Sequence, residues 1–207
     1  MRQKKLDEMK TDFINNMTHE LKTPISTISL SSNVINNKDI INQPERLKRY
    51  AKIISQENER LKNQVERVLQ LAFFEQKNFR LNYQAIDIID LLNKSAQPFE
   101  LLLQEKGGSY KISGKPQTIY VDLHHFRNTI SNLIDNAIKY CGGKSPKINI
   151  DVTKKKDNVF IKVTDNGIGL DKEEAKNIFN KFYRAPTGNV HNVKGFGIGL
   201  SYVLQII

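Results

Sequence analysis

The chain has 207 residues, which allows one large domain or two small ones, and its composition is 39% hydrophobic and 26% charged. These values exclude a disulfide-stapled peptide and a disordered tract, and the single Cys excludes an internal disulfide and a cysteine-based zinc cluster. The net charge of +10 favours an anionic partner such as nucleotide phosphate, an acidic protein, nucleic acid or a lipid surface, although solvated lysines explain it equally well.

The amino-terminal sequence and the hydropathy pattern bear on membranes. The first ten residues (MRQKKLDEMK) are too polar for a signal peptide, and no apolar run approaches the roughly 18 residues that a membrane-spanning helix needs. We therefore expect an intracellular chain, and we expect any membrane anchor of the natural protein to lie outside it.

The first third of the chain predicts two long helices. Gly is absent from residues 1–74, and apolar residues recur at steps of three and four. The segment 36–44 (NNKDIINQP) interrupts this pattern. The sequence therefore predicts an antiparallel helical hairpin over residues 1–78.

The second predicted helix carries a heptad seam, in which steps of four and three alternate. Its members are Leu47, Ala51, Ile54, Asn58, Leu61, Val65, Val68 and Ala72. Asn58 can fix the register and oligomeric state of such a seam, or it can simply lie at its rim. Two helices of about 30 residues cannot bury their apolar stripes well as an isolated hairpin, so a homodimeric four-helix bundle is predicted.

Beyond about Gln76 the pattern changes to an α+β type. Short β-type runs (FRLNYQAI, SYKIS, QTIYVD, KINIDVT, NVFIKVTD) alternate with helical patterns, and the glycines gather after Gly107. Helices are predicted at about 88–105, 123–140, 172–179 and from Gly197 onward. The lysines at 154–156 predict a solvated hairpin turn. We expect a second domain over residues 79–207.

His19 lies on the polar side of the first predicted helix. The apolar stripe consists of Ile14, Met17, Leu21, Ile25, Ile28 and Ile35, and its centre lies about 190° from His19 at about 100° per residue. An exposed His can be merely solubilising. Its neighbours favour a site instead, because Glu20 follows directly, Thr23 lies one turn later and Pro24 removes a helical hydrogen bond.

The stretch 13–24 (FINNMTHELKTP) resembles the H-box of the sensor histidine kinases, whose dimeric helical hairpin carries the phosphorylated histidine. The chemistry is reasonable, since a neutral imidazole nitrogen is a good nucleophile near neutral pH. The resemblance implies that His19 is phosphorylated and that Glu20 is its acid/base partner. It also implies that Thr23 orients the water that hydrolyses the aspartyl phosphate of a partner regulator.

The predicted helix 123–140 has a polar face that contains Asn132, Asn136 and Lys139 at i, i+4 and i+7. Such a face can be an ordinary solvated surface. However, Asn is a poor helix former, and a metal or phosphate site would explain a pair of them in mid-helix. An amide oxygen can bind Mg²⁺ while the phosphates of a substrate supply the negative charge.

Two glycine loops follow this helix. Residues 159–170 (VFIKVTDNGIGL) predict a strand that runs into a glycine loop, which matches neither the Walker A motif nor the complete dinucleotide-binding fingerprint. A second cluster, 195–200 (GFGIGL), opens the last predicted helix, whose free N–H groups favour an anion. Between them lie residues 178–185 (IFNKFYRA) and a polar stretch to Lys194 that we predict to be mobile.

In this order, the motifs resemble the N, G1, F and G2 boxes of the histidine-kinase ATP-binding domain, an α/β sandwich of the GHKL (Bergerat) type. The resemblance implies ATP and Mg²⁺ as cofactors. It assigns the adenine amino group to Asp165, and it assigns Mg²⁺ to Asn136 with help from Asn132.

The same resemblance assigns the remaining nucleotide contacts. Lys139 and Arg184 would contact phosphate, and Tyr140 would line the nucleotide pocket. The glycines that would let a lid approach the triphosphate are Gly167, Gly169, Gly195, Gly197 and Gly199.

Some features depart from the family pattern or match no motif in it. The family's domain continues past the G2 helix into a closing pair of strands, whereas this sequence ends at Ile207, so we expect a domain truncated at its C-terminal end. His124, His125 and His191 are expected at the surface. Cys141 is expected at the edge of the core rather than as a reactive thiol.

These expectations combine into the cytoplasmic catalytic core of a two-component sensor histidine kinase from the inner or plasma membrane. It would be a homodimer that autophosphorylates His19, passes the phosphoryl group to an aspartate of a response regulator receiver domain and dephosphorylates that regulator, without binding nucleic acid. One alternative is a non-kinase ATPase of the gyrase and mismatch-repair superfamily, in which ATP drives only a dimer switch. A nucleic-acid-binding module, the other alternative, rests on the net charge alone.

Overall fold

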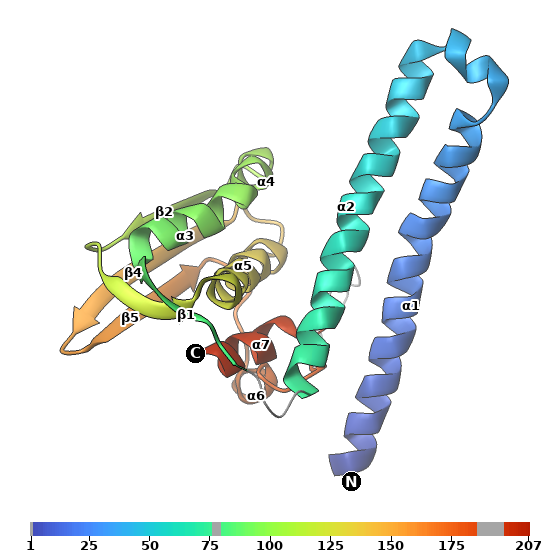
Figure 1. Cartoon of the computed structure of the whole chain (residues 1–207). Coiled ribbons are helices and arrows are strands. Elements are labelled where there is room, and N and C mark those ends of the chain that lie inside the picture. The colour runs from blue at the N-terminus through green and yellow to red at the C-terminus, as the bar shows by residue number, and fades with distance from the viewer. Residues whose placement is uncertain (1, 76–79, 186–196) are drawn as a thin grey trace. The chain divides into compact units, whose positions relative to one another are not determined.

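The computed structural model describes residues 2–75, 80–185 and 197–207. It separates into two compact units, Met1–Lys77 and Asn78–Ile207. Figure 1 shows the first unit as a hairpin of two long helices and the second as strands with packed helices. Within the described residues, no helix has both the length and the hydropathy to cross a bilayer.

The hairpin consists of α1 (Arg2–Ile35), the 3₁₀ turn η1 (Lys38–Asn42) and α2 (Pro44–Glu75). The side chain of Asn37 caps η1 by accepting a hydrogen bond from the backbone N–H of Asp39 at 3.2 Å, and Ile40 is buried. Pro44 begins α2 at the position where a missing N–H costs least. The predicted interruption at 36–44 is therefore an ordered turn.

Two neighbouring lines of residues run along α1. One line is buried or half-buried and consists of Phe13, Met17, Glu20, Pro24, Thr27, Ser31 and Val34. The predicted apolar stripe is displaced from it by one residue at most positions, and its members Ile14 and Ile25 are 47% and 51% exposed. The other members of the stripe are half-buried, so one hairpin alone leaves these two isoleucines about half exposed to water.

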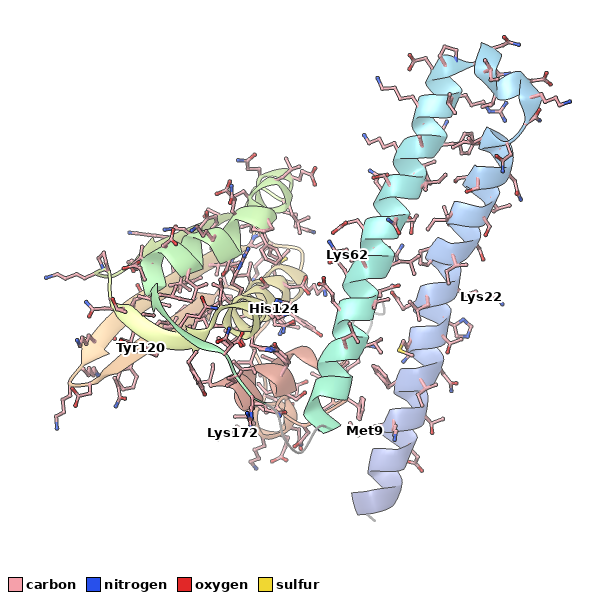
Figure 2. The ribbon with its side chains drawn as sticks, viewed as in Figure 1. Met9, Lys22, Lys62, Tyr120, His124 and Lys172 are labelled. Atoms are coloured by element: carbon pink, nitrogen blue, oxygen red, sulfur yellow. The ribbon has the colours of Figure 1, made fainter. Side chains whose placement is uncertain are left out.

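The residues of α2 divide in a similar way. In the predicted seam, Leu47, Ile54, Leu61 and Val68 are half-buried, whereas Ala51, Asn58 and Val65 are exposed. The most buried described position of α2 is the polar residue Gln64, at 5% exposure. Figure 2 shows side chains filling the space between the two helices, with Lys22 and Lys62 pointing away from it.

The described residues of the second unit form two sheets. The smaller sheet pairs β1 (Tyr83–Asp87) with β3 (Thr118–Asp122) in antiparallel fashion. The larger sheet has the order β2-β4-β5, with β2 (Ser109–Ser113) parallel to β4 (Lys147–Lys155) and β4 antiparallel to β5 (Asn158–Asp165). Of the lysines predicted to form a turn, only Lys156 does so, because pairing of Lys155 with Asn158 extends β4 to the end of the run.

The helices of this unit depart from the prediction at three points. The predicted helix 88–105 is divided into α3 (Ile88–Ala96), the 3₁₀ segment η2 (Gln97–Phe99) and α4 (Glu100–Glu105), because Pro98 cannot donate a backbone hydrogen bond. The predicted helix 172–179 is the shorter α6 (Lys172–Asn177). The last helix, α7 (Gly199–Ile206), begins after Gly197, whose φ of +69° is not helical.

The core of this unit lies between the larger sheet and the helices. Alternate residues of β4 (Ile148, Ile150 and Val152) are buried, so one face of the sheet is covered. They form one cluster with buried residues of α3 and of α5 (Leu123–Lys139), the helix predicted at 123–140. Figure 1 shows α3 and α5 over this sheet, so α5 is packed against the core along one side.

Candidate functional site

The first candidate site lies on α1, where His19 is exposed as the sequence predicts. Thr18 Oγ1 donates to the Ile14 carbonyl at 2.9 Å, and Thr23 Oγ1 donates to the His19 carbonyl at 3.4 Å. Both hydroxyls therefore donate to a backbone carbonyl of their own helix, while their oxygen lone pairs remain available as acceptors. The imidazole itself is open to an incoming reactant.

Glu20 is half-buried, and its contacts lie on α2. Gln64 Nε2 lies 3.3 Å from Glu20 Oε2, and Arg60 Nη2 lies 3.8 Å from the same oxygen. Among the described residues, His19 is not a hydrogen-bond partner of this carboxylate. Gln64 and Arg60 are not predicted from the sequence. The one signal is Pro24, which has no N–H and therefore leaves the carbonyl of Glu20 without its usual helical donor.

The second candidate site is built on α5 and the loops that meet it. The Asp122 carboxylate caps α5 by accepting a hydrogen bond from the backbone N–H of His125 at 3.0 Å, and its other oxygen accepts one from the N–H of Asn82, before β1, at 2.9 Å. Partial burial acts to raise the pKa of Asp122, but these hydrogen bonds outweigh it and hold that pKa below its usual value. The cap fixes where α5 begins and hence the face on which its asparagines lie.

Asn132 contacts the beginning of α7. A Cβ atom added to Gly199 would lie 3.2 Å from Asn132 Oδ1, so the glycine permits this close approach. Asn132 Nδ2 is buried and has no hydrogen-bond partner among the described residues. A phosphate oxygen would satisfy this donor, and turning the amide over would present its oxygen to a cation.

Asn136 and Lys139 follow Asn132 on the same face of α5, and both are half-buried. Lys139 Nζ donates to Asp135 Oδ2 at 2.5 Å within the helix. An ammonium group carries three N–H donors, so Lys139 could donate to a phosphate while it keeps its contact with Asp135. The phosphate contact that the family resemblance implies for Lys139 remains a prediction.

The first glycine loop packs on the end of α5. The Ile168 N–H donates to the Tyr140 carbonyl at 2.9 Å, and a Cβ atom added to Gly167 would lie 2.7 Å from both that carbonyl oxygen and Asp165 Oδ1. The Gly167 N–H also donates to Asp165 Oδ1 at 2.8 Å. These contacts bring Tyr140, Asp165 and Gly167 together and orient the exposed carboxylate of Asp165.

Asn166 was not singled out from the sequence, although it lies inside the DNGIGL motif. Its Oδ1 accepts a hydrogen bond from the Lys147 N–H at 2.8 Å, and its Nδ2 donates to the Ser145 carbonyl at 3.0 Å. Asn166 therefore ties the loop after β5 to the beginning of β4, which explains an amide between Asp165 and Gly167.

The second glycine cluster meets the segment 178–185. The Phe182 N–H donates to the Gly197 carbonyl at 2.9 Å, and a Cβ atom added to Gly197 would lie 2.8 Å from the Phe182 carbonyl carbon. Gly169 has a φ of +75°, and Arg184 is exposed. Gly195, His191 and the stretch predicted to be mobile up to Lys194 lie outside the described residues.

The surface prediction is correct for His124 but wrong for His125. His125 is half-buried, and its Nδ1 lies 2.6 Å from the hydroxyl of Tyr202, a fully buried residue of α7. Burial lowers the pKa of His125, and burial raises that of Tyr202 to about 12. This pair joins α5 to α7. Cys141 is buried, as expected.

A depression of about 420 Å³ lies at the start of α5 and is bordered by Asn82, Gln84, Asp122, Leu123, His124, Arg127, Asn128 and Ser131. None of the residues predicted to bind nucleotide borders it. Asn128 and Ser131 lie close to Asn132 along α5, but Asn132 itself does not border the depression. For this reason we place the candidate nucleotide site on the asparagines and glycine loops rather than in this depression.

Two family models match the chain. Residues 9–77 match the "His Kinase A (phospho-acceptor) domain", and residues 121–207 match the "Histidine kinase-, DNA gyrase B-, and HSP90-like ATPase". The sensor protein RprX of Bacteroides fragilis is 42% identical over all of this chain, which spans 40% of the length of RprX.

Solved structures of histidine kinases share the fold. The histidine kinase AdeS of Acinetobacter baumannii is 25% identical with a TM-score of 0.61, and the match covers 91% of this chain and 85% of that one. The histidine kinase ThkA, in a structure with the response regulator protein TrrA, is 22% identical with a TM-score of 0.54 over 89% of this chain and 53% of that one. The chain belongs to the sensor histidine kinases of two-component systems, with the phospho-acceptor match on its helical hairpin and the ATPase match on its α/β unit.

Proposed function

We propose that the chain phosphorylates itself on His19 at the expense of ATP and passes the phosphoryl group to an aspartate of a response regulator. The observation that carries this proposal is an exposed His19 on a helix that matches the phospho-acceptor model. Residues 1–78 would serve dimerisation and phosphotransfer, and residues 79–207 would bind ATP. The regulator is included because the similar kinase ThkA was solved with one.

In this reaction an imidazole nitrogen of His19 attacks the γ-phosphorus of ATP. The new P–N bond replaces the bond between the γ-phosphorus and the bridging oxygen, so that ADP leaves. The proton on the other ring nitrogen passes to a base, for which Glu20 is our candidate. Transfer to the regulator then moves the phosphoryl group to a carboxylate oxygen and restores the imidazole.

The residues of the second site fit a nucleotide with its metal ion. Asn132 Nδ2, which is buried and has no hydrogen-bond partner among the described residues, suits a phosphate oxygen, and the amide turned over would suit a cation. Asp165 presents a carboxylate held by the Gly167 N–H to an amino group. Asn136, with Asn132, would hold Mg²⁺, which neutralises negative charge on the triphosphate. Lys139, Arg184, Tyr140 and the glycines 167, 169, 195, 197 and 199 complete the proposed set.

The alternative of a non-kinase ATPase is not favoured. The ATPase match alone would suit either class, but the match of residues 9–77 to a phospho-acceptor domain gives the hairpin a role that a simple dimer switch lacks. The absence of nucleic-acid binding stays a prediction. We also propose that the chain is the cytoplasmic portion of a membrane sensor, as its family membership suggests.

Incubation with γ-labelled ATP and Mg²⁺ tests the proposed function. The chain should acquire label that is lost in acid and retained in alkali, because a phosphorylated imidazole is acid-labile. Label that survives acid, or ATP hydrolysis with no labelled protein, would favour a different phosphorylated residue or the ATPase alternative.

The exposed members of the apolar stripe, Ile14 and Ile25, lead to a prediction about dimerisation, which we propose on the basis of the phospho-acceptor match. Ile25→Glu places a charge on a stripe that needs a second hairpin to bury it, and a fully buried aliphatic side chain contributes about 1.5–3 kcal/mol. Light scattering at tens of micromolar should find a dimer for the parent chain and a monomer for the variant. Ile41→Glu, at a position 77% exposed in η1, is the matched control and should stay dimeric. A monomeric parent chain would contradict the bundle.

A separate prediction concerns Thr23, whose hydroxyl lies one turn after His19. If it orients water toward a regulator's aspartyl phosphate, Thr23→Ala should label with ATP at the parental rate but lose dephosphorylation of the regulator. A structural role for this hydroxyl, which contacts the His19 carbonyl, would impair both activities together. Thr27 makes the same type of contact one turn later, so Thr27→Ala serves as the control. Unchanged dephosphorylation would remove Thr23 from the site.

A further inference from the structure

A buried amide on α2 contacts the turn of α1 that carries the proposed phosphorylation site. Gln64 is 5% exposed, and its Nε2 lies 3.3 Å from both the backbone carbonyl oxygen and the Oε2 atom of Glu20. The two N–H bonds of one amide can serve two acceptors at once. Gln64 thus holds both the main chain and the carboxylate of Glu20.

The main-chain contact follows from Pro24. In an α-helix the carbonyl of residue 20 accepts its hydrogen bond from the N–H of residue 24, and proline has none. Gln64 supplies the missing donor from the opposite helix. A contact that served only to complete the helix would need this one hydrogen bond and no more.

The side-chain contact needs a separate explanation. Gln64 Oε1 is buried and has no hydrogen-bond partner among the described residues, which is unfavourable for packing alone. An apolar side chain of similar shape would fill the same volume without that unfavourable term. The amide is therefore better explained by what it donates to than by how it packs.

Arg60 does not replace this donor. Its guanidinium lies 3.8 Å from Glu20 and 3.6 Å from Glu57, so it is shared between two carboxylates at distances longer than a hydrogen bond. Among the described residues, Gln64 makes the side-chain hydrogen bond to Glu20.

We propose that Gln64 is a positioning residue for the phosphorylation of His19, because it fixes the carboxylate of Glu20 on the turn that carries the imidazole. This inference rests on the proposed function, in which Glu20 takes the imidazole proton. Without the amide, Glu20 would sample other rotamers, and fewer encounters with ATP would find the base in place.

The test compares Gln64→Met with Gln64→Lys in the whole chain. Both side chains have an unbranched apolar stem, but only Lys carries donors, and the two nearby carboxylates favour its charge. At saturating ATP, Gln64→Met should form acid-labile label roughly tenfold more slowly, with the KM for ATP unchanged. Gln64→Lys should recover most of the parental rate.

A double-mutant cycle with Glu20→Gln separates positioning from structure. If the amide acts through the carboxylate, adding Gln64→Met to Glu20→Gln should cause no further loss of rate. Gln56→Met, at an exposed position of α2, is the matched control and should label normally. Thermal unfolding of each variant establishes that it is folded.

Three outcomes would overturn the inference. Gln64→Met could label at the parental rate, Gln64→Lys could be as slow as Gln64→Met, or the loss could be equally large in the Glu20→Gln background. All three leave the proposed function intact, since the parent chain would still label on His19. A parent chain that never labels would instead overturn the proposed function, and with it this inference.

Discussion

Replacing His19 by Gln should abolish acid-labile labelling while leaving the affinity for ATP within a few-fold of the parent value. The imidazole is the proposed nucleophile, and an amide side chain cannot replace it. The nucleotide residues belong to the other compact unit, so their site should remain intact. Labelling with γ-labelled ATP measures the first effect, and titration with a fluorescent ATP analogue measures the second.

His124 provides the matched control for this variant. It is an exposed histidine of the second unit, labelled in Figure 2, and it does not belong to the proposed phospho-acceptor. His124→Gln should therefore label at the parental rate. Acid-labile label that persists in His19→Gln would show that another histidine is phosphorylated.

Replacing Asn136 by Ala should reduce Mg²⁺-dependent labelling by roughly 100-fold or more. The substitution removes the proposed amide ligand itself. Loss of a group that only hydrogen-bonds a metal ligand typically lowers affinity or activity by about 10–100-fold, so loss of a ligand should have at least that effect. The measurement is the initial rate of labelling over a range of Mg²⁺ concentrations, with light scattering to establish that the dimer is unchanged.

The control for Asn136 is Asn93, an exposed asparagine in another helix of the same unit. Asn93→Ala removes the same amide group far from the proposed metal ligands in sequence, and it should label normally. Normal labelling by Asn136→Ala at all Mg²⁺ concentrations would mean that the second site is misassigned.

The helices and strands that are predicted accurately are determined by residues within the element or directly beside it. Asp122 caps α5 with its own side chain, and the helix ends one residue before the predicted end. Likewise, β2 and β5 have the predicted bounds because alternating or β-branched residues stand between clear turn residues. Only short-range rules are needed in these cases.

The hairpin interior could not be predicted in the same way. Hydropathy selects Ile14 and Ile25, yet the more buried line includes Glu20, Pro24 and Ser31. A buried polar residue is explained by its partner, and the partner of Glu20 lies 44 residues away on α2. The pairing of Gln64 with Glu20 therefore required the structure, although His19 and Glu20 could be singled out from the motif.

The two units also differ in how far apart their contacting elements lie along the chain. α1 and α2 are joined by residues 36–43, whereas the parallel pairing of β2 with β4 closes a loop of residues 114–146 that contains β3 and α5. Closing a longer loop loses more entropy before any contact compensates for it, so such sheets form slowly. The hairpin also leaves the ribosome first. During synthesis, the helix that carries His19 should therefore be folded while the α/β unit is still assembling.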